Sequence, residues 1–289
     1  MSRLRRSEWV IIVYFTYTAI LPFFLEVRPP VRRITVAVNA AVILGLLLAV
    51  YAYQLRNNRL FSYVRDWYPA PLMILAYREM GWFAPPYHTY QLEQSWVVWD
   101  RMLLNQWGLK ALIELSGPVL PGLLELSYSL VYTMAPFAMA MLYAYGKRNR
   151  MDGFLFTFLV GIYSCYTLFP CFPSEPPRTV FPGEDFPSVY TVFRRFNWAL
   201  LGGYGIHTSV FPSAHAAGAF SAAFAAWREL PEQRWVGRLL LVLAVLIAIA
   251  IVYGRYHYAV DALAGFGASL LAVGASRVAG FRGPAHSKG

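Results

Sequence analysis

Long apolar runs, separated by short polar segments, dominate the hydrophobic pattern of the chain. A helix needs about 20 mainly apolar residues to cross a bilayer, so runs of this kind predict membrane spans. Good candidates lie at 9–25, 34–53, 119–145, 152–171, 212–227, 236–254 and 258–276. A weaker candidate at 67–84 contains Arg78 and Glu79, and an isolated charge is costly in lipid. The pattern therefore predicts an all-α, polytopic transmembrane bundle of six to eight spans.

Two longer segments interrupt this pattern. The segment 86–118 mixes aromatic, polar and charged residues, which predicts an interfacial helix with loops. The connection between 152–171 and 212–227 is rich in proline, and a continuous helix is excluded there. Its prolines are Pro170, Pro173, Pro176, Pro177, Pro182 and Pro187. We expect a structured loop over the bilayer surface, where loops often carry function.

Composition supports the membrane interpretation. Hydrophobic residues make up 58% of the 289 residues and charged residues only 14%, against about 25% charged in soluble domains. Lys and Arg total 25 and Asp and Glu total 15, with the basic residues clustered between apolar runs. Retention of loops in the cytoplasm and contact with anionic membrane lipids explain such clusters, so no nucleic-acid partner is expected. Cys165 and Cys171 form no zinc-binding pattern, and a disulfide between them stays open.

The basic clusters also orient the bundle. Placing 147–150 on one side of the membrane puts 228–238 and 277–288 on the same side. With 67–84 as a crossing segment, the cluster at 56–65 and the N-terminal arginines join them. The positive-inside rule makes that side cytoplasmic, although five arginines fall on the opposite side. We therefore expect a multi-pass protein of the cytoplasmic membrane.

This topology brings candidate chemistry to the extracytoplasmic face. Arg178, His215 and His257 fall there near the ends of three different spans, and Asp261 follows His257 by one helical turn. Residues at i and i+4 share a helix face, so Asp261 can fix the tautomer of His257 and leave its other ring nitrogen as nucleophile or base. His215 could protonate a leaving oxygen, and Arg178 could bind phosphoryl oxygens. These are the parts of a metal-free phosphoryl transfer through a phosphohistidine.

Each of these features also has a purely structural interpretation. A histidine at a span end is more often an interfacial packing residue, and His-x-x-x-Asp arises by chance in many chains. Pro212 and Ser213 form a common helix start, and Arg178 could simply bind lipid headgroups. Their combination on one predicted face favours a catalytic site, but the residues alone leave both interpretations open.

Three stretches resemble motifs of the type 2 phosphatidic acid phosphatase (PAP2) superfamily. Residues 211–218 (FPSAHAAG) resemble its second motif and residues 256–265 (YHYAVDALAG) resemble its third. Residues 176–178 (PPR) resemble the arginine end of its first motif. Order and spacing agree with the family, and the motif-bearing part, 119–276, is more than half of the chain.

The chain also departs from the broad family pattern. Cys171 stands where the first motif has a lysine, and Thr179 replaces the proline that follows its arginine. Ala214 replaces the glycine of the second motif. Ile251 stands where the third motif has an arginine, so Arg255 could supply that charge instead. These changes make the chain similar to the branch that includes inositol phosphorylceramide synthase and, more distantly, sphingomyelin synthase.

The resemblance implies a fold, a reaction and a set of residue roles. It implies a membrane phosphotransferase or phosphohydrolase, with transfer slightly favoured, which acts on a phospholipid or lipid phosphate without a metal or cofactor. His257 would be the nucleophile, Asp261 its orienting partner and His215 the acid and base. The implied phosphate-binding residues are Arg178, Arg255 and Ser213. Residues 119–289 would form the catalytic membrane domain, and 1–118 the N-terminal spans and interfacial segment of the same unit.

A non-catalytic lipid-binding or transport protein with the same fold is the alternative. It would need a path of charges through the membrane, for which Arg78, Glu79 and Asp100 are the candidates. The sequence predicts no oligomeric state.

Overall fold

The computed structural model describes residues 4–281, except 57–58, 85–88, 207 and 209. Every regular element in this part of the chain is helical, which confirms the all-α prediction. Five helices are long and apolar enough to cross a membrane, as an integral membrane protein requires. They are α2 (Pro29–Arg56), α7 (Val119–Ala144), α8 (Met151–Leu168), α12 (Arg234–Tyr253) and α13 (Ala259–Val278).

The other three expected spans are helical but shorter. They correspond to α1 (Arg6–Ile20), α4 (Pro69–Met80) and α11 (Ala214–Glu229), with 15, 12 and 16 residues. Helices of this length rise about 18–24 Å, less than the hydrocarbon core of about 30 Å. The count of six to eight spans is therefore approximate, because proline and cap residues shorten helices that the apolar runs alone would extend.

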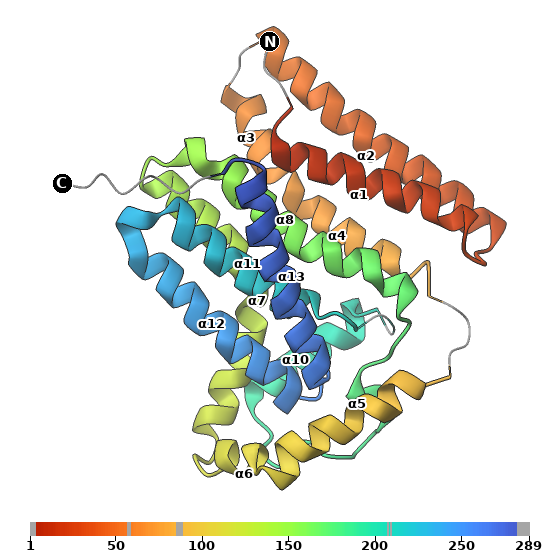
Figure 1. The fold of residues 1–289 in the computed structure, drawn as a ribbon, viewed down its shortest axis with the longest axis vertical. Coiled ribbons are helices and arrows are strands. Elements are labelled where there is room, and N and C mark those ends of the chain that lie inside the picture. The colour runs from red at the N-terminus through yellow and green to blue at the C-terminus, as the bar shows by residue number, and fades with distance from the viewer. Residues whose placement is uncertain (1–3, 57–58, 85–88, 207, 209, 282–289) are drawn as a thin grey trace.

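Helix α11 lies at the centre of the bundle and packs against α7, α8, α12 and α13. Its buried residues are mainly alanines, which let neighbouring backbones come close. A Cβ on Gly161 of α8 would lie 2.0 Å from the Ser221 hydroxyl, and a Cβ on Gly218 would lie 2.9 Å from Ile162. This close packing fixes the first turn of α11, which carries His215, in the interior of the bundle (Figure 1).

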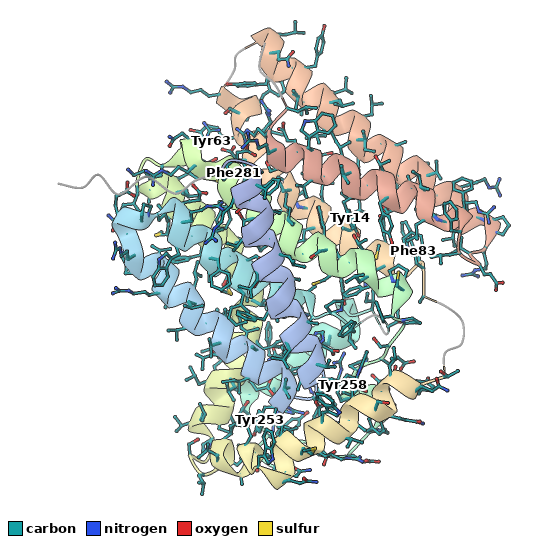
Figure 2. All side chains as sticks on the ribbon, viewed as in Figure 1. Tyr14, Tyr63, Phe83, Tyr253, Tyr258 and Phe281 are labelled. Atoms are coloured by element: carbon teal, nitrogen blue, oxygen red, sulfur yellow. The ribbon has the colours of Figure 1, made fainter. Side chains whose placement is uncertain are left out.

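Ion pairs join the N-terminus to two other segments at one end of the bundle. Arg65 of α3 (Arg59–Trp67) binds Glu8 at 2.6 Å. Asp66 of the same helix binds both Arg5 at 2.6 Å and Arg148 at 2.7 Å. Figure 2 marks this end with Tyr63 and Phe281. Three basic clusters that the topology puts on one side of the membrane are thus neighbours in the structure.

The two long connections lie at the other end of the bundle (Figure 1). The expected interfacial segment contains α5 (Gln91–Arg101), a π-helical turn and α6 (Leu109–Glu114). The proline-rich connection contains the short α9 (Pro177–Val180) and the longer α10 (Val192–Tyr204). Tyr253 and Tyr258, which flank the loop from α12 to α13, mark this end in Figure 2.

Candidate active site

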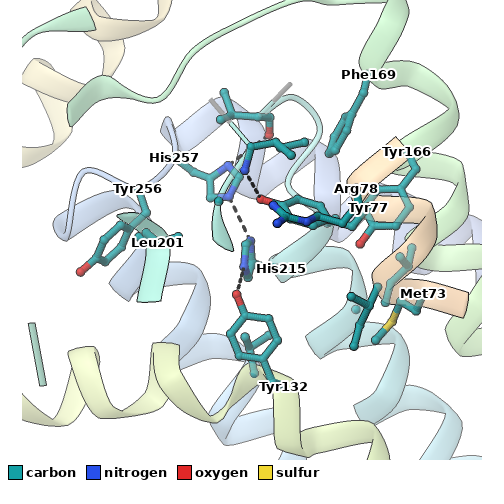
Figure 3. A pocket seen from close by; sticks show the side chains of 18 of the residues that line it. Met73, Tyr77, Arg78, Tyr132, Tyr166, Phe169, Leu201, His215, Tyr256 and His257 are labelled. Carbon is teal, nitrogen blue, oxygen red and sulfur yellow. Dashed lines mark hydrogen bonds between the residues drawn. The ribbon is translucent and has the colours of Figure 1, made fainter. Parts of the chain in front are cut away.

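His215 and His257 face each other inside the bundle (Figure 3). His215 Nδ1 lies 3.2 Å from His257 Nε2, and the Tyr132 hydroxyl lies 3.3 Å from His215 Nε2. On its other side, His257 Nδ1 lies 3.1 Å from the Val210 carbonyl oxygen and 3.3 Å from Asp261 Oδ2. A carbonyl oxygen can only accept a hydrogen bond, so Nδ1 carries the proton and Nε2 is the basic nitrogen.

The environment of His257 keeps its imidazole neutral. The ring belongs to the loop between α12 and α13, outside both spanning helices, and is 6% exposed. Burial, together with the charge of Arg178, lowers its pKa from 6.5 to about 3, although the hydrogen bond to Val210 acts in the opposite direction. A neutral imidazole with one free nitrogen is the form that can attack phosphorus.

A residue of α5 holds the loop that carries His257 in place. Arg255 has a φ of 63° at the end of α12, a backbone conformation that non-glycine residues rarely adopt. Its guanidinium is fully buried and binds Asp100 Oδ2 at 2.6 Å. Asp100 Oδ1 also accepts from the backbone N–H of Ala259 at 2.8 Å and so caps the start of α13. One buried carboxylate therefore holds both ends of this loop.

A second buried carboxylate fixes the residue before His257. Glu125 of α7 accepts from Arg194 at 2.8 Å, from Asn197 at 2.8 Å and from the Tyr256 hydroxyl at 2.7 Å. The Tyr256 ring also stacks on Tyr128, with centroids 4.3 Å apart. Arg194, one of the five arginines that the predicted topology places on the extracytoplasmic side, is thus an internal partner. Glu125 is the sequence feature that could have indicated an internal basic partner, since it is an acidic residue inside an apolar run.

A cavity of about 320 Å³ opens beside the two histidines. Its polar lining includes the histidines, Arg178, Arg78 and several tyrosines, and its remaining walls are mainly apolar. Arg178 donates to the Tyr256 carbonyl at 3.3 Å, which directs its guanidinium along this wall. Ile74 lines the cavity and is 64% exposed, so the cavity extends to the outer surface of the bundle.

The structure brings together only part of the predicted site. The catalytic candidates His215, His257 and Asp261 are adjacent, and Arg178 lines the same cavity. Arg255 is absent from the cavity lining because its side chain turns to Asp100. Ser213 is also absent from the lining; its hydroxyl accepts from the backbone N–H of Ala216 at 3.3 Å and caps α11.

Other residues singled out by sequence lie in different surroundings. Arg78 lines the cavity, whereas the Glu79 carboxylate is buried beside Thr18 and Asn39, and Asp100 binds Arg255. These three charges therefore do not form one path through the bundle. Cys165 and Cys171 are both free thiols, the first buried and the second exposed. Among the described residues, no three His, Cys, Asp or Glu side chains group as metal ligands.

Gly265 provides a test of how tightly the two motif-bearing helices must pack. The Ser213 N–H donates to the Asp261 carbonyl at 3.0 Å, and a Cβ on Gly265 would lie 2.4 Å from the Ser213 carbonyl oxygen. We expect Gly265→Ala to destabilise the protein by about 1–3 kcal/mol, because backbone atoms would have to move. Turnover should also fall, because the shift separates His257 from His215. Thermal unfolding and initial rates in detergent measure both effects.

Gly267 of the same helix is the matched control. A Cβ at this position would meet no atom within 4 Å. Gly267→Ala should keep wild-type turnover and gain up to about 1 kcal/mol from helix propensity. Equal behaviour of the two variants would show that close contact between α11 and α13 does not position the histidines.

Comparison with known proteins identifies a family that the chain resembles. A family model described as the PAP2 superfamily matches residues 94–275. A PA-phosphatase related-family protein of Dictyostelium discoideum is 31% identical over 126 residues, which are 40% of this chain and 21% of that protein. The chain thus spans about a fifth of the length of this relative. No solved structure matches.

Proposed function

The chain belongs to the PAP2 superfamily, and on this basis we propose that it is a membrane phosphotransferase or phosphohydrolase that acts on a phospholipid or lipid phosphate through a phosphohistidine. Family membership itself supports a phosphatase-type enzyme. The observation that carries the finer proposal is the environment of His257. Its Nδ1 is held by Val210 and Asp261, while its Nε2 points toward His215 at the cavity. This is the arrangement that a nucleophilic imidazole requires.

In the first half of the reaction, His257 Nε2 attacks phosphorus and the bond from phosphorus to the leaving oxygen breaks. His215, charged in the substrate complex, gives its proton to that oxygen and becomes neutral. Arg178 binds the non-bridging oxygens as their charge grows. The nitrogens that face each other are 3.2 Å apart. The attacking nitrogen must itself lie about 3 Å from phosphorus. The two imidazole rings must therefore move apart when the substrate binds between them.

In the second half, neutral His215 takes a proton from the acceptor, whose oxygen attacks the phosphohistidine and releases His257. With a lipid phosphate as donor, water as acceptor yields inorganic phosphate. With a phospholipid donor, water yields the phosphorylated headgroup, and a lipid alcohol yields a new headgroup-bearing lipid. The departures at Cys171, Thr179 and Ala214, which are shared in pattern with the inositol phosphorylceramide synthase branch, slightly favour an alcohol. Asp261 keeps the imidazole oriented through both halves.

We place this reaction at the extracytoplasmic face of the cytoplasmic membrane. The basic clusters at the N-terminus, at 59–65 and at 147–150 gather at the end of the bundle far from α5 and α6. Under the positive-inside rule, that end faces the cytoplasm. The His257 loop then lies near the opposite surface, where the apolar cavity walls suit acyl chains and the arginine suits a phosphate.

A panel of lipids tests the proposed function. Purified protein would be incubated with phosphatidic acid or phosphatidylinositol, each with and without diacylglycerol or ceramide. Free phosphate from phosphatidic acid, or inositol phosphate from phosphatidylinositol, identifies a phosphohydrolase, and a new lipid that carries the donor headgroup identifies a transferase. If folded, monodisperse protein produced neither product from any donor, the proposal would be rejected.

A further inference from the structure

The departures from the family pattern leave the cavity short of positive charge. The positions of two expected cations hold Cys171, which is exposed, and Ile251, which is fully buried in the core. Arg255, the sequence-based substitute, is committed to Asp100. The cavity lining nevertheless contains two arginines and no acidic side chain among the described residues, and only Arg178 belongs to a motif.

The second arginine, Arg78, comes from α4. The preceding residue, Tyr77, ties this helix to the site, because its hydroxyl accepts from the backbone N–H of Ile206 at 2.9 Å. Arg78 and Arg178 both line the cavity beside His215 and His257. Figure 3 shows Arg78 and Tyr77 together beside the column formed by Tyr132, His215 and His257.

The carboxylate next in sequence does not neutralise Arg78. Consecutive helical residues point about 100° apart, and Glu79 turns toward α1 and α2, where it lies beside Thr18 and Asn39. Its two oxygens are buried there. Glu79 is not among the residues that line the cavity, so its carboxylate is directed away from the space that Arg78 lines.

We propose that Arg78 binds the phosphoryl oxygens of the substrate together with Arg178 and replaces the cation that is missing at position 171. Two guanidinium groups can hold a tetrahedral oxyanion from different sides and stabilise the charge that builds up on its oxygens during transfer. This inference rests on the proposed function, since it concerns the same cavity. It makes α4, which lies outside the family match at 94–275, a part of the site.

Orthovanadate, a phosphate mimic, provides a test that separates binding from chemistry. Its dissociation constant would be measured from vanadate-dependent thermal stabilisation of purified protein, and turnover of phosphatidic acid would be measured in parallel. We expect Arg78→Gln to weaken vanadate binding by about 10- to 100-fold, because a charge-assisted contact is lost. Arg78→Lys should weaken it by about 3- to 10-fold, because the charge stays and the fork is lost. Arg195→Gln, at an exposed position of α10 outside the cavity lining, should match the wild type.

The outcomes separate this inference from the proposed function. Wild-type vanadate affinity in either Arg78 variant, alongside loss of affinity in Arg178→Gln, would overturn the inference even if lipid turnover is normal. Should Arg78→Gln fail to fold, the Arg78→Lys comparison alone decides the matter. Vanadate binding that depends on Arg78 in a protein that turns over no lipid phosphate would support the inference and reject the proposed function.

Discussion

Replacement of His257 by alanine is expected to lower turnover by on the order of 10⁴-fold or more. The imidazole Nε2 is the proposed nucleophile, and alanine leaves no nitrogen at that place to form the covalent intermediate. His215→Ala should cause a loss of similar size, since the leaving oxygen then has no proton donor. Initial rates on the best lipid donor, with purified variants in detergent or in vesicles, measure both losses.

Two controls show whether these losses of turnover come from the missing imidazole or from unfolding of the variant. His215→Ala should keep a melting temperature near that of the wild type, because its ring contacts the Tyr132 hydroxyl and His257 and no buried carboxylate. His257→Ala should lower the melting temperature, because the fully buried Asp261 carboxylate loses its imidazole partner and keeps the Tyr258 N–H. Gly267→Ala, purified in parallel, should keep full activity. Substantial turnover in either histidine variant would contradict the mechanism as a whole.

Replacement of Asp100 by alanine is expected to destabilise the protein by about 3–5 kcal/mol. The side chain binds Arg255 at 2.6 Å, and both groups are fully buried, so its removal leaves the Arg255 charge in the interior with Asp185, at 4.0 Å, as a more distant partner. The Ala259 N–H at the start of α13 also loses its acceptor. Turnover should fall with stability, because this loop positions His257. Chemical or thermal unfolding in detergent measures the change.

A second substitution distinguishes the ion pair from a general packing defect. Adding Arg255→Gly to Asp100→Ala removes the buried cation, and glycine adopts the φ of 63° at this position without strain. We expect the double variant to recover part of the lost stability and turnover. If the double variant were less stable than Asp100→Ala alone, the buried cation would not be the cause. Recovered turnover would also show that Arg255 is not needed to bind phosphate.

The membrane class and the core of the candidate site follow from local features of the sequence. Apolar runs, basic clusters and proline positions are read directly along the chain, and they predicted the all-α bundle. His257 and Asp261 are one helical turn apart, so their contact follows from helix geometry. His215 joined them through a topology argument based on charge. In each case the information lies within one element or in the order of spans.

The partners that hold the site could not be predicted in the same way. Asp100 and Arg255 are 155 residues apart in sequence, and Glu125 and Arg194 are 69 apart. The sequence does not distinguish an arginine that is buried in such a pair from an arginine at a lipid surface. The motif pattern therefore suggested that Arg255 binds phosphate, although the structure turns its side chain to Asp100 of α5. Only tertiary packing shows which carboxylate each guanidinium binds.

Arg78 illustrates a further limit of sequence analysis. As a charge in a weak candidate span, it was a candidate for a transport path, and no role in phosphate binding was predicted for it. Helix α4 instead presents the two charges to different surroundings, one to the cavity and one to α1 and α2. Family motifs gave no reason to look there, because the matched region begins at residue 94.

The covalent intermediate is the most direct test of the central claim. Wild-type protein would be mixed with a lipid donor labelled with ³²P in the transferred phosphoryl group and quenched in alkali within one turnover. The label would then be mapped by peptide mass spectrometry. The account predicts an acid-labile phosphohistidine on the peptide that contains His257, and no label in His257→Ala. Full turnover by the wild type without this adduct, or label on a different residue, would contradict the account.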